Sequence, residues 1–190
     1  LRQIRSGEGF NLGTLCIKDR LTNQISNKIH THNHHLCHAA AGFQTSPFDS
    51  ATVVVIDAIG ELDCISIWDA CYDKNGNAHY TKLWSKKYPN SIGLFYSAMT
   101  QQVGLKPNEE EYIMMGMAGW GEHGFSALLK QDFVYNEFDI KFKENFHLGI
   151  DPKYLDHIAD MDLAAGAQDL AENLIYNVMR RAKDLNWSNN

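Results

Sequence analysis

The sequence lacks the features that mark membrane, secreted and nucleic-acid-binding proteins. No apolar run approaches the ~20 residues that a membrane-spanning helix needs. The first residues, 1–5, are not followed by the apolar stretch of a secretory signal. Basic residues form no run, and the formal net charge is −6. Because binding to nucleic acid without sequence preference needs a basic surface, we expect neither a membrane nor a nucleic acid as a partner.

Cysteine is scarce and forms no CxxC pair, which argues against a disulfide framework. The four cysteines are Cys16, Cys37, Cys64 and Cys71. We expect free thiols and a cytoplasmic location, with Cys64 and Cys71 on strands and Cys37 as a small buried residue. No repeat or low-complexity segment is present. The composition, 44% hydrophobic and 21% charged, is that of an ordinary globular domain.

The most informative segment, residues 33–43, carries three histidines behind a helix-start signal. Asn33 can accept hydrogen bonds from the free N–H groups of a first helical turn, and the alanines that follow favour a helix. In a helix, His34 and His38 are four residues apart and project from one face. Two imidazoles so placed can share one metal ion. His35 should point away, since adjacent helical residues face different directions.

A third candidate ligand, Asp57, ends the apolar run 52–56, nineteen residues after His38. That run predicts a strand buried on both faces. A carboxylate at its end would open onto the crevice where α/β sheets bind ligands. We expect ligand atoms of His34, His38 and Asp57 within about 5 Å of one another. The alternative is a chance spacing, because five of the nine histidines fall between residues 30 and 38 and could simply meet backbone or water.

Three antiparallel strands are predicted next, over residues 51–57, 62–72 and 78–88. Gly60 is available for a positive φ in the first connection, and Asn-Gly at positions 75 and 76 signals a hairpin in the second. Helices should follow. We expect them over residues 91–104 with Ser91 as the cap, near residues 152–158, and as a long helix to about Leu185 with Asp162 as the cap. The expected class is therefore mixed α/β, with an antiparallel meander and flanking helices.

Three segments in the same order resemble the NodU/CmcH family of O-carbamoyltransferases. Residues 34–49 carry the histidine motif and Ser-Pro-Phe-Asp, and residues 55–61 carry the strand-end aspartate and Gly-Glu. Residues 91–121 carry Ser-Ile-Gly-Leu-Phe-Tyr, Glu-Glu-Tyr and Met-Gly-Met-Ala. Two positions depart from the family pattern. Ala58 stands where the family usually has Gly, and Ile113 stands where it usually has Lys.

The resemblance implies an actin-like (RNase H-like) ATPase domain of the Kae type. It implies transfer of a carbamoyl group from carbamoyl phosphate, with ATP and through carbamoyl adenylate, to a hydroxyl of a small-molecule acceptor. His34, His38 and Asp57 would hold a divalent metal, iron by family, although the ligand set also suits zinc. Two histidines and one aspartate leave coordination positions open, as a catalytic site requires. Gly60 and Glu61 would form the hairpin that faces nucleotide or phosphate.

The resemblance also implies that residues 1–190 form one partial domain. The chain begins with Leu1 rather than Met, so we expect its start to lie upstream. The facing half of the site and a further aspartate ligand are expected beyond residue 190. Alone, the 190 residues should bind metal weakly and transfer no carbamoyl group. They should also self-associate, as a homo-oligomer or less specifically, through exposed apolar surface.

Two other functions compete with this prediction. A tRNA threonylcarbamoyladenosine biosynthesis protein shares the actin-like fold and an HxxxH pair, but the acidic balance and residues 115–118 argue against it. A non-enzymatic, metal-binding actin-like module is the other alternative. Fold order alone does not separate these functions. Binding to tRNA would favour the first alternative, and ATP-dependent release of phosphate from carbamoyl phosphate would exclude the second.

Overall fold

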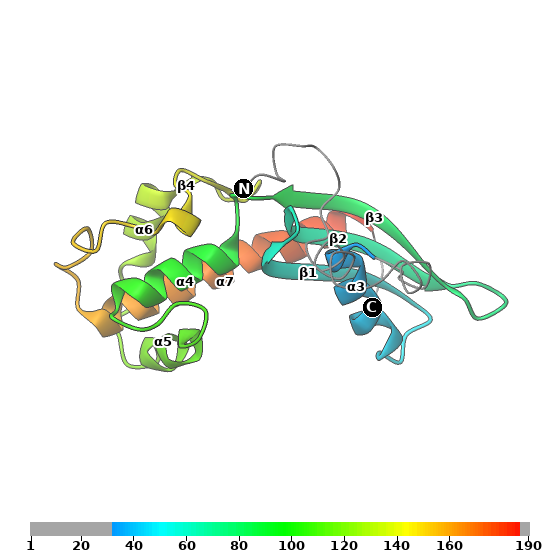
Figure 1. Ribbon diagram of the computed structural model, residues 1–190, viewed down its shortest axis with the longest axis horizontal. Coiled ribbons are helices and arrows are strands. Elements are labelled where there is room, and N and C mark those ends of the chain that lie inside the picture. Colours follow the sequence, from blue (N-terminus) through cyan, green and yellow to red (C-terminus); the bar gives the residue numbers. More distant parts are fainter. Residues whose placement is uncertain (1–31, 187–190) are drawn as a thin grey trace, which may run out of the picture.

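The chain is built on a three-stranded antiparallel sheet in the order β1–β2–β3. A computed structural model describes residues 32–186 (Figure 1). The strands are β1 (Ser50–Gly60), β2 (Asp63–Tyr72) and β3 (Ala78–Lys87). The predicted meander is confirmed. Gly76, with φ of 80°, supplies the positive φ of the second hairpin, where the Asp73 carboxylate accepts hydrogen bonds from two backbone N–H groups.

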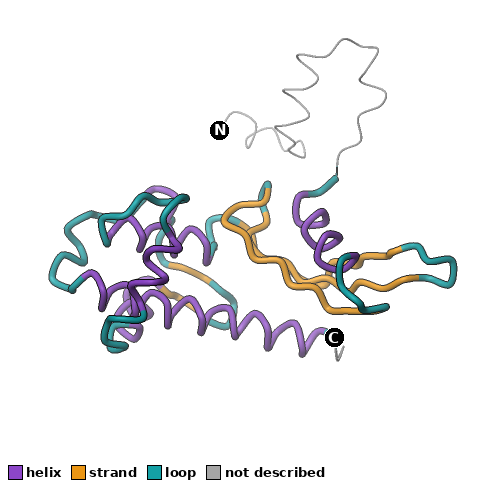
Figure 2. The backbone as a smooth tube through the Cα atoms, turned by 90° about the horizontal axis from the view of Figure 1, so that it is seen from below, coloured by secondary structure: helices purple, strands orange, loops and turns teal. Residues whose placement is uncertain are grey.

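The helices are α3 (His34–Gln44), α4 (Ile92–Gln102), α5 (Glu111–Ala118), α6 (Ser126–Phe133) and α7 (Asp160–Leu185). Helix α3 covers one face of the sheet and α4 and α7 cover the other, whereas α5 and α6 pack on α7. Between α6 and α7 lie β4 (Val134–Asn136), β5 (Lys141–Phe142) and the 3₁₀ helix η1 (Phe146–Leu148). Figure 2 shows α3 on one side of the sheet and α7 running along the other. The mixed α/β class is therefore as expected.

Strand alternation explains this layering, because successive side chains of a strand point to opposite faces. On β1, Val53 and Val55 pack in small clusters with Ala39 of α3 and Trp68 of β2. Val54 and Ile56 instead meet the large core built with α4 and α7. The two faces of β1 therefore serve two different helical layers, as its continuous apolar run predicts.

The end of β1 is irregular, and this corrects two expectations. Ile56 pairs with Ile65 and Gly60 pairs with Asp63, so residues 57–59 oppose Cys64 alone. This is a bulge, which bends a strand and re-aims its side chains. Asp57 therefore lies in the bulge of a longer strand rather than at the strand end. The positive φ of the following turn belongs to Glu61, at 62°, because Gly60 is still paired.

Helix starts were predicted with mixed success. The Ser91 side chain accepts a hydrogen bond from Leu94 N and caps α4, as expected. Asp162 does not cap α7, which begins two residues earlier at Asp160. The Asp162 carboxylate instead accepts from Glu122 N, because that segment lies against the first turn of α7. The helix predicted near residues 152–158 is wrong: this stretch forms turns.

The cysteines are free thiols where the structure describes them. Cys64 is buried, and burial raises the pKa of its thiol to about 11. Cys71 is partly exposed. The expectation for Cys37 is wrong, because its side chain is exposed and the buried position of that turn belongs to His35. Cys16 lies outside the described residues.

Apolar side chains are exposed on the outer helices. On α5 these are Tyr112 and Met115, and on α7 they are Tyr176 and Met179. Self-association through such surface stays a prediction. Between residues 32 and 186, no helix combines the length and the apolar character needed to cross a membrane.

Candidate metal centre

Asn33 fixes the start of α3 through two hydrogen bonds, one to the helix and one to the turn after β1. Its side-chain oxygen accepts a hydrogen bond from Leu36 N at 3.0 Å and caps the helix, as predicted. Its side-chain nitrogen donates to Glu61 Oε2 at 3.2 Å. One residue therefore joins the first turn of α3 to the turn that follows β1. This contact brings the histidines to the bulge of the sheet.

The three predicted ligands converge at this junction. His34 Nε2 lies 2.8 Å from Asp57 Oδ2 and 3.0 Å from His38 Nε2. His38 Nε2 lies 3.8 Å from the same carboxylate oxygen. All three residues offer ligand atoms within 4.8 Å of one another, as expected from the sequence. Ala58 N donates to Asp57 Oδ1 at 2.7 Å, so the other oxygen is turned toward the histidines.

Hydrogen bonds alone cannot satisfy this arrangement. A neutral imidazole carries one ring hydrogen, so a hydrogen on His34 Nε2 can serve Asp57 or His38 but not both. Without that hydrogen, His34 Nε2 and the Asp57 carboxylate present lone pairs to each other at 2.8 Å. A cation between the three atoms would remove this conflict, because each would then direct a lone pair at it.

The spacing also suits a metal ion. Bonds of about 2.1 Å at tetrahedral or right angles place neighbouring ligand atoms roughly 3.0–3.4 Å apart. The observed separations of 2.8, 3.0 and 3.8 Å bracket that range. Side-chain exposures of 44% for His34, 54% for His38 and 28% for Asp57 leave one side of the cluster open. The residues present therefore fit a divalent metal with open coordination positions.

His35 takes no part in this cluster, as predicted. It is fully buried, and its Nδ1 lies 2.6 Å from Ser66 Oγ on β2. Burial lowers the pKa of His35 below its ordinary value, against the opposing charges of Asp63 and Asp57. Sequence reasoning found no role for Ser66, because nothing in a strand pattern shows which helix residue a serine will meet.

The predicted phosphate-side residues, Gly60 and Glu61, lie beside the cluster. Gly60 is buried and packs against histidine rings: a Cβ there would stand 2.6 Å from His35 Nε2 and 2.7 Å from His34 Cδ2. Glycine is therefore required at this position by close packing. A role of Gly60 and Glu61 toward phosphate stays a prediction.

Replacing Gly60 with Ala should disturb the cluster and the fold together. His35 cannot move from its buried position, so the more exposed His34 ring must turn away from Asp57. We expect metal affinity to fall about tenfold or more, as when ligand-orienting contacts are lost, and stability to fall by about 1–3 kcal/mol. Metal titration and thermal unfolding measure the two effects.

Gly42→Ala is the matched control, because Gly42 lies in α3, the helix that carries His34 and His38. A Cβ at Gly42 would meet only Val53 Cγ1, at an ordinary 3.9 Å. This variant should keep the parent affinity and lose no stability, since alanine favours a helix. Equal metal affinity in the Gly60→Ala variant and the parent would contradict the packing argument.

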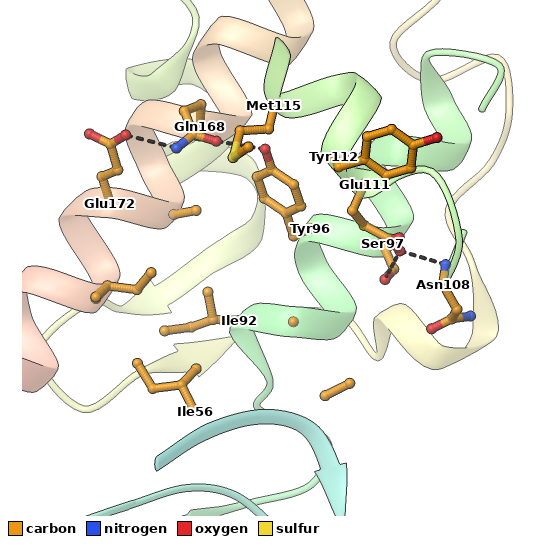
Figure 3. Close-up of a pocket in the computed structure, with 14 residues that line it drawn as sticks. Ile56, Ile92, Tyr96, Ser97, Asn108, Glu111, Tyr112, Met115, Gln168 and Glu172 are labelled. Carbon is orange, nitrogen blue, oxygen red and sulfur yellow. Dashed lines mark hydrogen bonds between the residues drawn. The ribbon is translucent and has the colours of Figure 1, made fainter. Parts of the chain in front are cut away.

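A separate cavity of about 630 Å³ lies across β1 from the cluster (Figure 3). Ile56, Ala58 and Ile92 contribute to its apolar floor. Polar groups at its rim are already bonded to one another: Tyr96 Oη donates to Gln168 Oε1 at 2.6 Å, and Gln168 Nε2 donates to Glu172 Oε1 at 2.7 Å. Burial raises the pKa of Tyr96 to about 12, so the phenol stays a donor.

This cavity clarifies one departure from the family pattern. The Ala58 side chain faces the cavity, whereas the side chain of its neighbour Asp57 faces the histidines. The extra methyl group at position 58 therefore does not enter the cluster. Ile113, the other departure, lies on α5 and belongs neither to the histidine–aspartate cluster nor to the lining of this cavity.

Comparison with known protein families identifies the family to which this chain belongs. Residues 11–184 match the family described as carbamoyltransferase N-terminus, so the chain belongs to that family. It is similar to the uncharacterized protein sll1178 of Synechocystis, at 38% identity over 59% of this chain and 17% of that protein. It is also similar to the uncharacterized protein MJ1058 of Methanocaldococcus jannaschii, at 28% identity over 86% of this chain and 30% of that protein. The chain thus spans less than a third of either relative.

Proposed function

We propose that this chain supplies the metal-binding side of an ATP-dependent O-carbamoyltransferase of the NodU/CmcH type, built on an actin-like ATPase domain. The enzyme would move a carbamoyl group from carbamoyl phosphate, through carbamoyl adenylate, to a hydroxyl of a small-molecule acceptor. Membership of the carbamoyltransferase N-terminus family supports carbamoyl transfer in general. The observation that carries the proposal is the convergence of His34, His38 and Asp57 in a member of that family.

The proposed cofactor is a divalent metal, iron first and zinc second, since imidazole and carboxylate ligands suit both. Such a metal can polarise a carbonyl group or lower the pKa of a hydroxyl group. The chain's own residues prepare its site. Asn33 fixes the helix that carries His34 and His38, and Ala58 N holds Asp57 Oδ1 so that Oδ2 faces them. The open side of the cluster gives a small acceptor room to approach.

Phosphate groups of ATP or carbamoyl phosphate would lie at the turn after β1, near Gly60 and Glu61. A cavity of about 290 Å³ at this turn is lined by Asn33 and Glu61 together with Lys82 and Lys87. Lysine is a point charge that suits phosphate. Lys82 is also 2.7 Å from the buried Asp63 carboxylate, which holds the ammonium group in place. Glu61 and Asp63 also line this cavity and balance the two lysine charges, so the support for the assignment is the presence of ammonium donors beside the turn and not a net positive charge.

The remaining parts of the proposal concern surroundings and partners. A cytoplasmic location agrees with the free thiols of Cys37, Cys64 and Cys71. The acidic net charge of −6 favours a small-molecule acceptor over a nucleic acid. Exposed apolar residues on α5 and α7 favour self-association.

The test is an assay of the complete gene product with carbamoyl phosphate, ATP and ferrous iron. We expect phosphate release that depends on both ATP and iron, and its loss in the Asp57→Ala variant. Absence of turnover in the parent with every nucleotide and metal tried would favour the non-enzymatic alternative. Tight binding to tRNA, with threonylcarbamoyl transfer to it, would instead replace the proposal with tRNA modification.

A further inference from the structure

His35 differs in kind from the histidines on either side of the turn. His34 and His38 are exposed, whereas His35 has no accessible surface. One ring nitrogen, Nδ1, is bonded to Ser66 Oγ. The other, Nε2, makes no hydrogen bond of good geometry within the described part of the chain, although the Asp63 backbone lies close enough to the ring to influence its pKa. An apolar residue would fill this space without burying an unpaired polar atom. A histidine at this position therefore calls for a structural or functional explanation.

The reason begins with a chain of hydrogen bonds inside the protein. Trp68 Nε1 donates to Ser66 Oγ at 2.7 Å, and an indole can only donate. The Ser66 hydroxyl accepts that bond and has its own hydrogen free to donate to His35 Nδ1 at 2.6 Å. Ser66 is fully buried and Trp68 is 5% exposed, so water does not compete. Each group fixes the next, and the ring of His35 has one orientation.

The fixed ring touches both parts of the candidate metal centre. Gly60, which ends the bulge of Asp57, approaches so closely that a Cβ there would lie 2.6 Å from His35 Nε2. The same Cβ would lie 2.7 Å from the His34 ring. On α3, His35 is also less than one helical turn from His38, the other histidine of the cluster. The position of this one ring therefore limits where the helix and the bulge can lie.

We infer that His35, Ser66 and Trp68 form a buried positioning chain that sets the distance between the two histidine ligands on α3 and Asp57 on β1. This inference rests on the proposed metal function of that cluster. The three residues lie outside the ligand cluster of His34, His38 and Asp57, and His35 Nε2 faces Gly60 instead. Shifts of about half an ångström are enough to spoil such a site. Breaking the hydrogen bonds among His35, Ser66 and Trp68 should therefore lower metal affinity without removing a ligand.

Cobalt(II) titration of the complete gene product tests the inference, because cobalt reports ligand geometry through its visible absorption. We expect Ser66→Ala to weaken cobalt binding about tenfold or more, the range seen for outer-sphere partners, and to change the absorption spectrum. His35→Leu should do the same. His35→Asn should recover part of the affinity, since its side-chain oxygen can accept the Ser66 hydrogen bond near the position of Nδ1.

Thr100→Val is the matched control, because Thr100 is also a fully buried hydroxyl residue but lies on α4, on the other side of the sheet. Thr100→Val removes the hydrogen bond from Thr100 Oγ1 to Tyr96 O, so thermal unfolding is measured for every variant. Thr100→Val should leave cobalt affinity and spectrum unchanged. If His35, Ser66 and Trp68 had a purely structural role, Ser66→Ala would lower the melting temperature without changing the cobalt absorption spectrum.

Two results overturn the inference in distinguishable ways. Parent-like cobalt affinity and spectrum in folded Ser66→Ala and His35→Asn would refute the positioning role while leaving the metal proposal intact. Failure of the unchanged protein to bind cobalt would refute the metal proposal and, with it, this inference.

Discussion

Replacing Asp57 with Ala should remove high-affinity metal binding. Among residues 32–186, Asp57 supplies the only carboxylate of the cluster, and its Oδ2 lies 2.8 Å from His34 Nε2 and 3.8 Å from His38 Nε2. Its loss leaves two imidazoles as the ligands from this part of the protein, so we expect affinity for ferrous iron or cobalt(II) to fall on the order of a hundredfold or more, beyond the ~10–100-fold typical of losing an outer partner. His34→Ala and His38→Ala should have similar effects. Metal analysis and titration of the complete gene product measure them.

The chain provides a matched control for this experiment. His123 Nδ1 lies 3.0 Å from Asp169 Oδ1, and the side-chain exposures of 60% and 27% resemble the 44% and 28% of His34 and Asp57. This pair lacks a second histidine. His123→Ala should therefore leave metal content unchanged. Unaltered metal content in all three cluster variants would show that the ligands have been wrongly assigned.

The strands and the caps were predictable because local sequence determines them. The apolar run of β1, the Asn-Gly turn and the Ser91 cap each act within a few residues, and the meander followed from them. The same local reasoning failed at the start of α7. Asp162 has the chemistry of a cap, but its carboxylate is taken by Glu122 N from a segment forty residues earlier. Such competition is tertiary and leaves no mark in the local pattern.

At the candidate site, too, features set by local sequence were predictable and features set by tertiary packing were not. The spacing of His34 and His38 placed both rings on one helix face, and the apolar run before Asp57 indicated a carboxylate at the end of a strand, to which the resemblance to the family assigned the same role. The support around them was not predictable. A β-bulge depends on pairing between strands, and the burial of His35 depends on which strand residue faces α3. The expectations that failed here were a buried Cys37, Asp57 at the end of its strand and a positive φ at Gly60, and each depends on this pairing and packing.

Gly121→Ala should be the most destabilising of the glycine substitutions. Gly121 follows α5 and lies against the first turn of α7, where a Cβ would overlap the Met161 carbonyl group and stand 2.9 Å from Asp162 N. These are backbone atoms, so the new methyl group must push the helix start away rather than turn a side chain. The hydrogen bond from Glu122 N to Asp162 would be lost with it. We expect stability to fall by about 3 kcal/mol, the upper part of the usual range for overpacking.

Thermal and urea unfolding of the 190-residue chain, followed by circular dichroism, measure this effect. For a chain of this size, the loss corresponds to a melting temperature lower by roughly 6–12 °C. Gly116→Ala is the control, because it lies inside α5 with nothing within 4 Å of an added Cβ. It should raise stability by up to about 1 kcal/mol, the advantage of alanine over glycine in a helix. If Gly121→Ala unfolded at the same temperature as Gly116→Ala, the close packing of the α5–α6 connection on α7 would be refuted.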